Sequence, residues 1–213
     1  MDLKGGATGW YLPEAAHPYY VLAPHFQIEF ASPLGPNPPV DPTSVEQFKD
    51  DESVGFLQDG KVRTLLANAK PLSTVNADDY TAIFYVGGHG PVIDLPFDDD
   101  NLQVANKFYR SGKVVAAVCH GPAALVNVTG ADGKSIFDGK TATAFSLVEE
   151  QEVGKVESVP FQIEERIKER GGKYVKAAEH WGVKICHDGT LLTGQNPASA
   201  KPLGEELLKT LKK

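Results

Sequence analysis

Lys113 to Ala123 reads KVVAAVCHGPA, and these eleven residues contain the clearest structural signal in the sequence. Its first six residues are nearly all apolar, as expected of a strand that is covered on both faces of a sheet. Cys119 follows at once between small residues, and an alanine-rich helical start comes after Pro122. A reactive side chain between small neighbours, placed where a strand turns into a helix, is typical of a nucleophile elbow. The segment therefore predicts an α/β protein with Cys119 as its candidate nucleophile.

The rest of the chain alternates strand and helix patterns around this segment. We expect strands at 25–31, 80–86, 113–118, 183–186 and 190–193, and helices at 98–110, 161–170 and 197–211. Residues 32–44 hold five prolines and predict an extended surface loop. Such alternation favours a mostly parallel sheet with helices on both faces, whose ligands bind beyond the carboxyl ends of the strands.

Composition narrows the possible functions. The 213 residues suggest a single domain, 1–213, with a net charge of −7 that argues against nucleic acid or an anionic membrane as a partner. No apolar run approaches the ~18 residues of a membrane span, and the first residues have no signal core. Two cysteines in unlike surroundings predict no disulfide and a reducing compartment, so we expect a cytoplasmic protein that can also enter the nucleus.

Two segments contain the candidate catalytic and substrate-binding residues. The helix after Cys119 is expected to point its amides at the sulfur and lower the pKa of the thiol, although a buried structural cysteine is the simpler alternative. Gly87-Gly88-His89-Gly90 follows the other apolar strand, and Gly88, His89 and Gly90 are candidate oxyanion or substrate-binding residues. Glycines at this place are also common in plain turns. No HExxH, GxGxxG or Walker pattern is present, so neither a metal nor a cofactor is predicted, and Cys186 is read as structural.

Five stretches together resemble one known family. They are Thr8–Pro18, Ala31–Pro33 with its proline-rich sequel, Gly88–Gly90, Ala116–Pro122 and Thr193–Ala200. The chain resembles the ThiJ/PfpI superfamily over essentially its whole length, and more specifically the fungal branch of glutathione-independent glyoxalases (glyoxalase III) and heat-shock chaperones. The resemblance implies a flavodoxin-like three-layer sandwich.

The resemblance also implies a catalytic set. Cys119 and His120 match the nucleophile and the histidine after it, and Glu150 matches the acidic partner by spacing, with Glu149 as its competitor. Glu14 matches a glutamate that contacts the nucleophile, and burial there would raise its pKa and make it a proton donor. From the residues alone, the run 149–152 reads as a solvated surface and Glu14 as an exposed helix residue. His17 and His89 are expected either to be structural or to contact the catalytic residues without contacting the substrate.

The start of the chain departs from the family pattern. Members usually begin with a short hydrophobic strand in the middle of the sheet, whereas the first seven residues here read MDLKGGA. We therefore expect a sheet without that strand and with two unpaired strand edges.

The resemblance predicts a lyase of the D-lactate dehydratase class that converts methylglyoxal or glyoxal without glutathione or any cofactor. Cys119 would form a hemithioacetal with the aldehyde. The alternatives are a stress-induced, redox-sensitive holdase that binds unfolded proteins, a protein deglycase, and a cysteine peptidase or amidase. A homodimer is expected, as in relatives.

Overall fold

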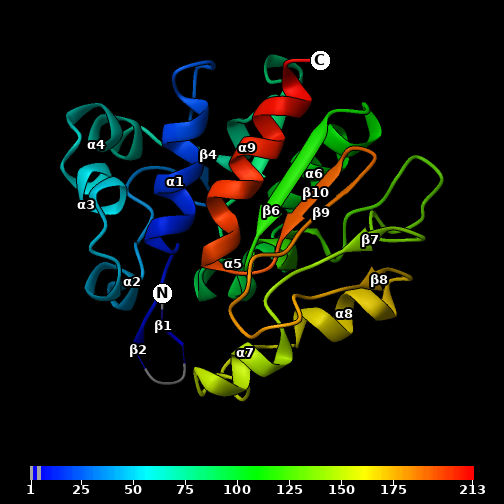
Figure 1. Ribbon diagram of the computed structural model, residues 1–213. Helices are drawn as coiled ribbons and strands as arrows, with labels where there is room; N and C mark the ends of the chain where they lie inside the picture. The colour runs from blue at the N-terminus through cyan, green and yellow to red at the C-terminus, as the bar shows by residue number, and fades with distance from the viewer. Residues whose placement is uncertain (1, 4–5) are drawn as a thin grey trace.

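A mostly parallel sheet with helices on both faces forms the centre of the molecule, as the computed structural model shows in Figure 1. The structure describes residues 2–3 and 6–213. The strands are β1 (Asp2–Leu3), β2 (Gly6–Ala7), β3 (Ala31–Ser32), β4 (Lys70–Pro71), β5 (Ala82–Tyr85), β6 (Val114–Val118), β7 (Thr141–Ala142), β8 (Lys173–Tyr174), β9 (Ile185–Asp188) and β10 (Leu191–Gly194). The α-helices are α1 (Leu12–Leu22), α2 (Pro42–Gln47), α3 (Asp51–Gln58), α4 (Gly60–Ala67), α5 (His89–Ile93), α6 (Asp99–Arg110), α7 (Leu147–Glu152), α8 (Ile163–Glu169) and α9 (Ala200–Leu211). Short 3-10 helices lie at Leu72–Thr74, Ala77–Asp79, Leu95–Phe97, Gly121–Leu125 and Pro197–Ser199.

The main sheet has the strand order β5-β6-β10-β9. The first three strands are parallel, with Phe84 and Leu192 on either side of Ala116, and β9 returns antiparallel to β10. Parallel strands place their carboxyl ends at the same edge of a sheet. The loop that starts at Gly87 and the turn at Cys119 therefore lie side by side.

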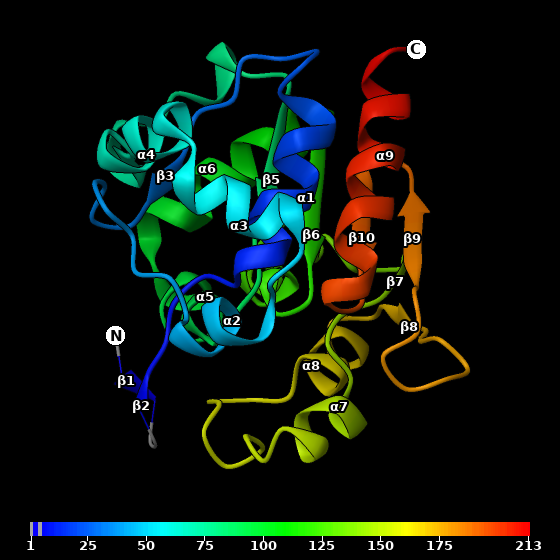
Figure 2. The ribbon, with the colours of Figure 1, turned by 60° about the vertical axis from the view of Figure 1, so that its left-hand side comes forward.

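Two apolar layers sandwich this sheet. α1 and α9 lie together on one face, and α6 covers the other (Figures 1 and 2). Side chains of β6 alternate between the layers, as the period of a strand requires. The α1/α9 layer buries Leu22, Ala116, Val118, Leu203 and Leu207. The α6 layer buries Val104, Phe108, Val115, Ala117 and Leu125.

Most of the predicted elements are present. The structure confirms those at 80–86, 98–110, 113–118, 161–170 and 197–211 as β5, α6, β6, α8 and α9, and the expected hairpin as β9 and β10, all with slightly different ends. Asp98 caps α6 by accepting a hydrogen bond of 2.7 Å from the Asn101 amide, which is why acidic residues mark this start. The α/β fold class is likewise confirmed.

Three predictions for the first half of the chain are wrong in detail. Only Ala31–Ser32 of the expected strand at 25–31 forms a strand, and it pairs with β4 instead of the main sheet. The loop at 32–44 ends early, because Pro42 begins α2. β5 was expected to be buried on both faces, yet Phe84 is only half-buried, and no described strand lies beside β5 on the side away from β6.

The first residues stand apart from the sheet. Asp2–Leu3 pairs with Gly6–Ala7 alone, and residues 1, 4 and 5 lie outside the described part of the chain. The four described residues thus supply no strand to the main sheet. In residues 2–3 and 6–213, no helix has the length and apolar character needed to cross a bilayer.

Candidate active site

Cys119 occupies the sharp turn that the sequence predicts. Its φ of +59° lies in the left-handed region, which a residue with a side chain adopts only when its surroundings impose it. Two backbone hydrogen bonds of 2.9 Å do so here, from the Cys119 amide to the Gly194 carbonyl and from the Phe145 amide to the Cys119 carbonyl. The side chain is 3% exposed. The turn therefore holds the sulfur in a fixed, shielded position at the end of β6.

The expected lowering of the Cys119 pKa is wrong. Burial raises the pKa of this thiol well above its ordinary value, and the nearby Glu14 carboxyl raises it further. The Gly88 amide lowers it without offsetting the burial. The following segment is only a short 3-10 helix, Gly121–Leu125. The resting nucleophile is thus a thiol, and its activation requires a base.

His120 is placed to be that base. Its Nδ1 lies 3.3 Å from the Cys119 sulfur, and its Nε2 lies 2.6 Å from Oε2 of Glu150. Burial and the neighbouring His89 lower the pKa of His120, which favours a neutral ring. Burial opposes ionisation of Glu150, but attraction to His120 and hydrogen bonds from both histidines lower the pKa of its carboxyl to about 2. An ionised carboxylate only accepts, so His120 Nε2 carries the proton and Nδ1 faces the thiol as an acceptor.

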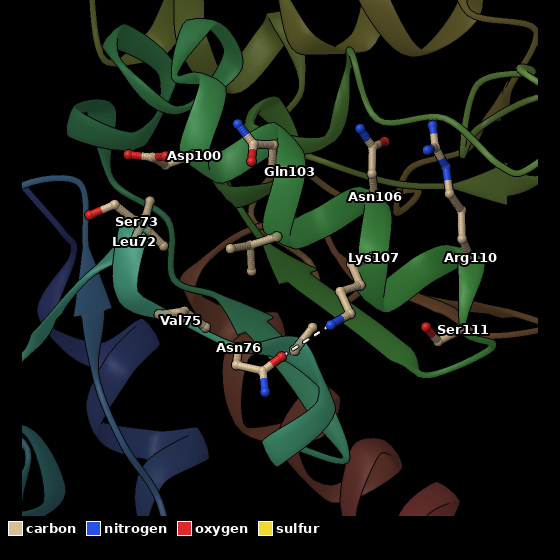
Figure 3. A pocket seen from close by; sticks show the side chains of 12 residues that line it. Leu72, Ser73, Val75, Asn76, Asp100, Gln103, Asn106, Lys107, Arg110 and Ser111 are labelled. Carbon is tan, nitrogen blue, oxygen red and sulfur yellow. Dashed lines mark hydrogen bonds between the residues drawn. The ribbon is translucent and has the colours of Figure 1, made fainter.

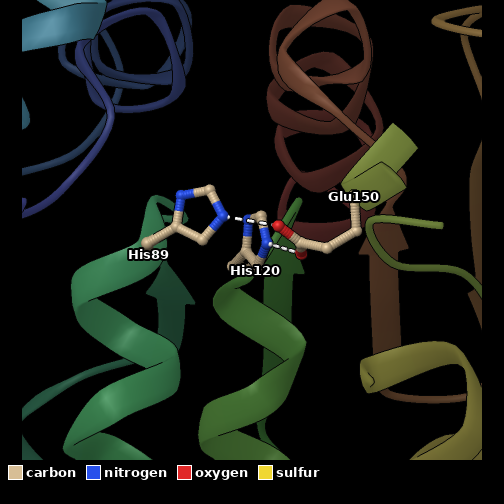
Figure 4. Close-up of side chains that lie close together, drawn as sticks. All are labelled: His89, His120 and Glu150. Carbon is tan, nitrogen blue, oxygen red and sulfur yellow. Dashed lines mark hydrogen bonds and ion pairs between the residues drawn. The ribbon is translucent and has the colours of Figure 1, made fainter. Parts of the chain in front are cut away.

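A second histidine holds the other oxygen of the same carboxylate. His89 Nε2 lies 2.7 Å from Oε1 of Glu150, and the rings of His89 and His120 are 4.2 Å apart (Figure 4). The ligand atoms of these three residues lie within 4.8 Å of one another, so the group could also hold a metal ion. His89 was expected to bind substrate or to support the site, and its contact with Glu150 agrees with the second of these expectations. The sequence did not predict that Glu150 is its partner.

Glu14 lies close to the Cys119 sulfur, as the resemblance implies. It is fully buried in α1, and neither carboxyl oxygen has a partner of ordinary hydrogen-bond geometry in the described chain. Burial raises its pKa to about 8, with the Cys119 thiol and the Gly87 amide near enough to reduce the shift. Near neutral pH this carboxyl holds a proton beside the sulfur.

The glycine loop allows this close approach. A Cβ at Gly87 would overlap the Glu14 carboxyl and would lie 2.8 Å from Cβ of Cys119. Gly88 has a φ of +99° and turns its amide toward the sulfur, whereas the Gly90 amide donates to the Gly9 carbonyl at 3.2 Å. Of the candidate oxyanion residues, Gly88 thus presents its amide to Cys119, whereas Gly90 does not.

Glu149 is a structural residue and does not touch His120. Its side chain forms a capping box with Ser146 at the start of α7 and accepts hydrogen bonds from Gln195 and Asn196 at 3.0 and 2.8 Å. Glu149 and Glu150 are buried whereas Gln151 and Glu152 are exposed, so the reading of the run 149–152 as a solvated surface is wrong for its first two residues and right for the last two. Glu149 and Glu150 are neighbours in α7, but Glu149 stabilises the start of the helix and Glu150 contacts His120.

Two aromatic side chains, Phe145 and Trp181, cover His120. The sequence did not predict this contact. The ring of Phe145 packs 4.4 Å from that of His120, and Trp181 packs edge-on against Phe145 at 5.5 Å. Trp181 is 40% exposed, has a φ of +60° and donates from Nε1 to Glu152. Phe145 and Trp181 are far apart in the sequence and both lie in loops, so no helical or strand periodicity indicates that they meet.

The remaining candidates lie elsewhere. His17 contacts Asp50 at 3.0 Å and joins α1 to the start of α3, and Cys186 is buried in β9. A surface hollow of about 530 Å³ between α6 and residues 72–77 contains none of the candidate residues (Figure 3).

A left-handed cysteine after a parallel strand, with a histidine and a carboxylate aligned behind it, defines an α/β protein of the cysteine nucleophile-elbow class. The profile of the DJ-1/PfpI family matches residues 59–210, and the chain belongs to this family.

Several relatives are similar along almost their whole length. The chain is 34% identical to the glutathione-independent glyoxalase HSP31 of Saccharomyces cerevisiae, covering 98% of this chain and 91% of that protein. The crystal structure of glyoxalase III from Candida albicans matches with a TM-score of 0.88 and 29% identity, over 97% of this chain and 90% of the other. The Francisella tularensis Rapid Encystment Protein 24 KDa matches with a TM-score of 0.91 and 35% identity, over 99% and 94%.

Proposed function

We propose that this protein is a glutathione-independent glyoxalase that converts methylglyoxal and water to lactate. The names of its relatives support this function. The observation that carries it is that a protonated Glu14 and a neutral His120 both lie beside the sulfur of Cys119. A reaction that moves a proton between adjacent carbons needs groups near the nucleophile that can give and take protons.

The first step is addition of the thiol to the aldehyde carbon. His120 Nδ1 takes the thiol proton while the sulfur forms a C–S bond, and the protonated Glu14 gives its proton to the aldehyde oxygen. The products are a hemithioacetal, a charged His120 ring and an ionised Glu14. Glu150 stabilises the positive charge that develops on the ring, because its ionised oxygen lies 2.6 Å from Nε2. The Gly88 amide stabilises negative charge that develops beside the sulfur.

The second step moves a proton from the former aldehyde carbon to the neighbouring ketone carbon. The ionised Glu14 takes the C–H proton while His120 gives its proton to the ketone oxygen, which yields an enediol. Glu14 then protonates the next carbon, and His120 takes the O–H proton of the former aldehyde carbon, which yields the thioester of lactate. Glu14 suits this transfer because its pKa of about 8 lets it both give and take a proton near neutrality. Water then attacks the thioester carbon, the C–S bond breaks, and the thiol recovers its proton as lactate leaves.

The test is lactate formation from methylglyoxal with glutathione omitted. We expect turnover in the wild type and none in Cys119→Ala. Cys186→Ala is the matched control, since Cys186 lies in β9 outside the contacts described above, and it should keep the activity. In D2O the lactate should carry deuterium at the carbon that was the ketone. Lactate formation by Cys119→Ala at the wild-type rate would refute the proposal.

A further inference from the structure

The loop that joins β8 to β9 (Figure 2) has an exposed tip, residues 178–181. The last residue of this tip, Trp181, packs edge-on against Phe145, whose ring packs against that of His120. No step of the proposed reaction uses either aromatic residue. The tip therefore contacts the active site without taking part in its chemistry.

Cys119 is shielded from solvent on the side of His120. These two residues are 3% and 2% exposed. Outward from them, the exposed fraction rises to 5% at Phe145 and to 40% at Trp181. A molecule that reaches the sulfur must displace a covering side chain, and on this side the covering consists of the two aromatic rings.

Trp181 limits how far Phe145 can move. The backbone of Phe145 is fixed, because its amide donates to the Cys119 carbonyl at 2.9 Å. Its movement is therefore a rotation of the ring about the side-chain bonds. The ring lies 4.4 Å from that of His120 and 5.5 Å from that of Trp181, so an outward rotation requires Trp181 to give way.

The base of the loop is tied to α7 through buried side chains. Glu149 accepts hydrogen bonds from Gln195 and Asn196. Gln195 in turn accepts from the Ala177 amide at 2.8 Å, and Asn196 donates to the Gly182 carbonyl at 2.9 Å. Ala177 and Gly182 flank the tip, so both of its ends are held at a buried carboxylate.

The tip itself is held by a different residue of α7, Glu152. One carboxylate oxygen lies 2.7 Å from Nδ1 of His180, and the other accepts from Nε1 of Trp181 at 2.7 Å. His180 and Glu152 are exposed, so water competes with their contact. The φ of +60° at Trp181 is strained and persists only while such contacts impose it. The tip can therefore be released while the base of the loop stays in place.

We propose that Trp181 is a specificity-determining residue, a wall that limits the size of the electrophile that reaches Cys119. Glu152 is the positioning residue that holds this wall. A small aldehyde enters with a slight rotation of Phe145, whereas a bulky one requires Trp181 to leave Glu152. The identity of the aldehyde rests on the proposed function, but the control of access to Cys119 does not.

The test compares alkylation of Cys119 by a small electrophile, iodoacetamide, and by a bulky one, N-phenylmaleimide, with mass spectrometry of the labelled peptides. Trp181→Ala removes the aromatic contact and should raise the rate with N-phenylmaleimide by about tenfold. It should raise the rate with iodoacetamide by less than about twofold, because a small reagent needs little displacement. Cys186 in the same samples is the internal reference and should keep its rates.

A pair of variants tests the role of Glu152. Glu152→Ala removes both contacts with the tip and should raise the rate with N-phenylmaleimide at Cys119 by about threefold. Glu179→Ala is the matched control, because it removes the same charge from the exposed tip and from none of these contacts, and it should match the wild type. All three variants change exposed residues, so the fold should stay intact.

Turnover of two aldehydes is the second measurement. The ratio of kcat/KM for phenylglyoxal to that for methylglyoxal should rise by about tenfold in Trp181→Ala. If the wild type converts neither aldehyde, the proposed function fails, and the alkylation rates still decide the role of Trp181. An unchanged ratio of the two alkylation rates in Trp181→Ala would overturn the proposal. Equal effects of Glu152→Ala and Glu179→Ala, or a parallel rise at Cys186, would also overturn it, since they indicate a general loosening of the fold.

Discussion

Replacing Glu14 with glutamine should change how stability depends on pH. The pKa of the Glu14 carboxyl is about 8 in the folded protein and 4.5 ordinarily. Between these values the unfolded chain releases the proton that the folded chain keeps. Rising pH therefore favours unfolding, by up to about 1.4 kcal/mol per pH unit. The loss in the free energy of unfolding that Glu14 causes is absent well below pH 4.5, grows up to about pH 8 and is constant above that pH.

The magnitude follows from the same two pKa values. From pH 5 to pH 8, Glu14 alone should lower the free energy of unfolding by several kcal/mol, on the order of 3–4. Glu14→Gln keeps the shape of the side chain and cannot ionise, so it should lack this loss. The difference in stability between variant and wild type should thus shift by the same amount in favour of the variant over this range.

Urea unfolding at pH 5, 6, 7 and 8 measures the effect. Glu205→Gln is the matched control, because Glu205 is exposed on α9, and its stability curve should follow that of the wild type. Parallel curves for Glu14→Gln and the wild type would show that the carboxyl ionises normally and that Glu14 does not hold a proton beside the sulfur.

Three further predictions concern the neighbours of the sulfur. Glu150→Gln should lower kcat for lactate formation by roughly 10²-fold and leave the fold intact. Glu149→Gln should lower the free energy of unfolding in urea by about 1–3 kcal/mol, because Glu149 caps α7 and accepts buried hydrogen bonds. The reverse pattern would show that Glu149 is the partner of His120. Alkylation of Cys119 by iodoacetamide, followed by mass spectrometry, should be slow at pH 7 and speed up with each pH unit to pH 9, since burial raises its pKa; a rate that is flat over this range would show a preformed thiolate. Gly87→Ala should abolish turnover in the same lactate assay, because the added Cβ overlaps the Glu14 carboxyl and lies 2.6 Å from the Val118 carbonyl; wild-type kinetics would show that Glu14 can move away without effect.

The sequence predicted the parts of the site that local patterns encode. The strand before Cys119 and the turn after it are contiguous, so the elbow could be read from residues 113–123 alone. Glu14 and Glu150 came only from the resemblance, because their contacts join segments more than a hundred and about thirty residues from Cys119. The carboxylate that His89 and His120 share depends on where α5 and α7 meet, which no local pattern specifies.

The errors have a common physical origin in burial. The pKa of Cys119 was expected to fall because a helix start follows it, but desolvation exceeds that effect and is invisible in sequence. The alternation at 25–31 predicted a strand, yet a strand also needs a neighbour on its edge, and only Ala31–Ser32 has one in β4. A local sequence preference favours a helix or a strand, but the neighbouring elements of the fold determine whether it forms.

The left-handed backbone of Cys119 has a consequence for how such a site survives. A residue with a side chain pays roughly 1–2 kcal/mol in this conformation, and glycine pays almost nothing. A change to glycine at this turn would therefore relieve the backbone strain and at the same time delete the buried side chain and its reactive sulfur. The strained conformation is thus a local cost in stability that comes with placing a thiol at the end of β6.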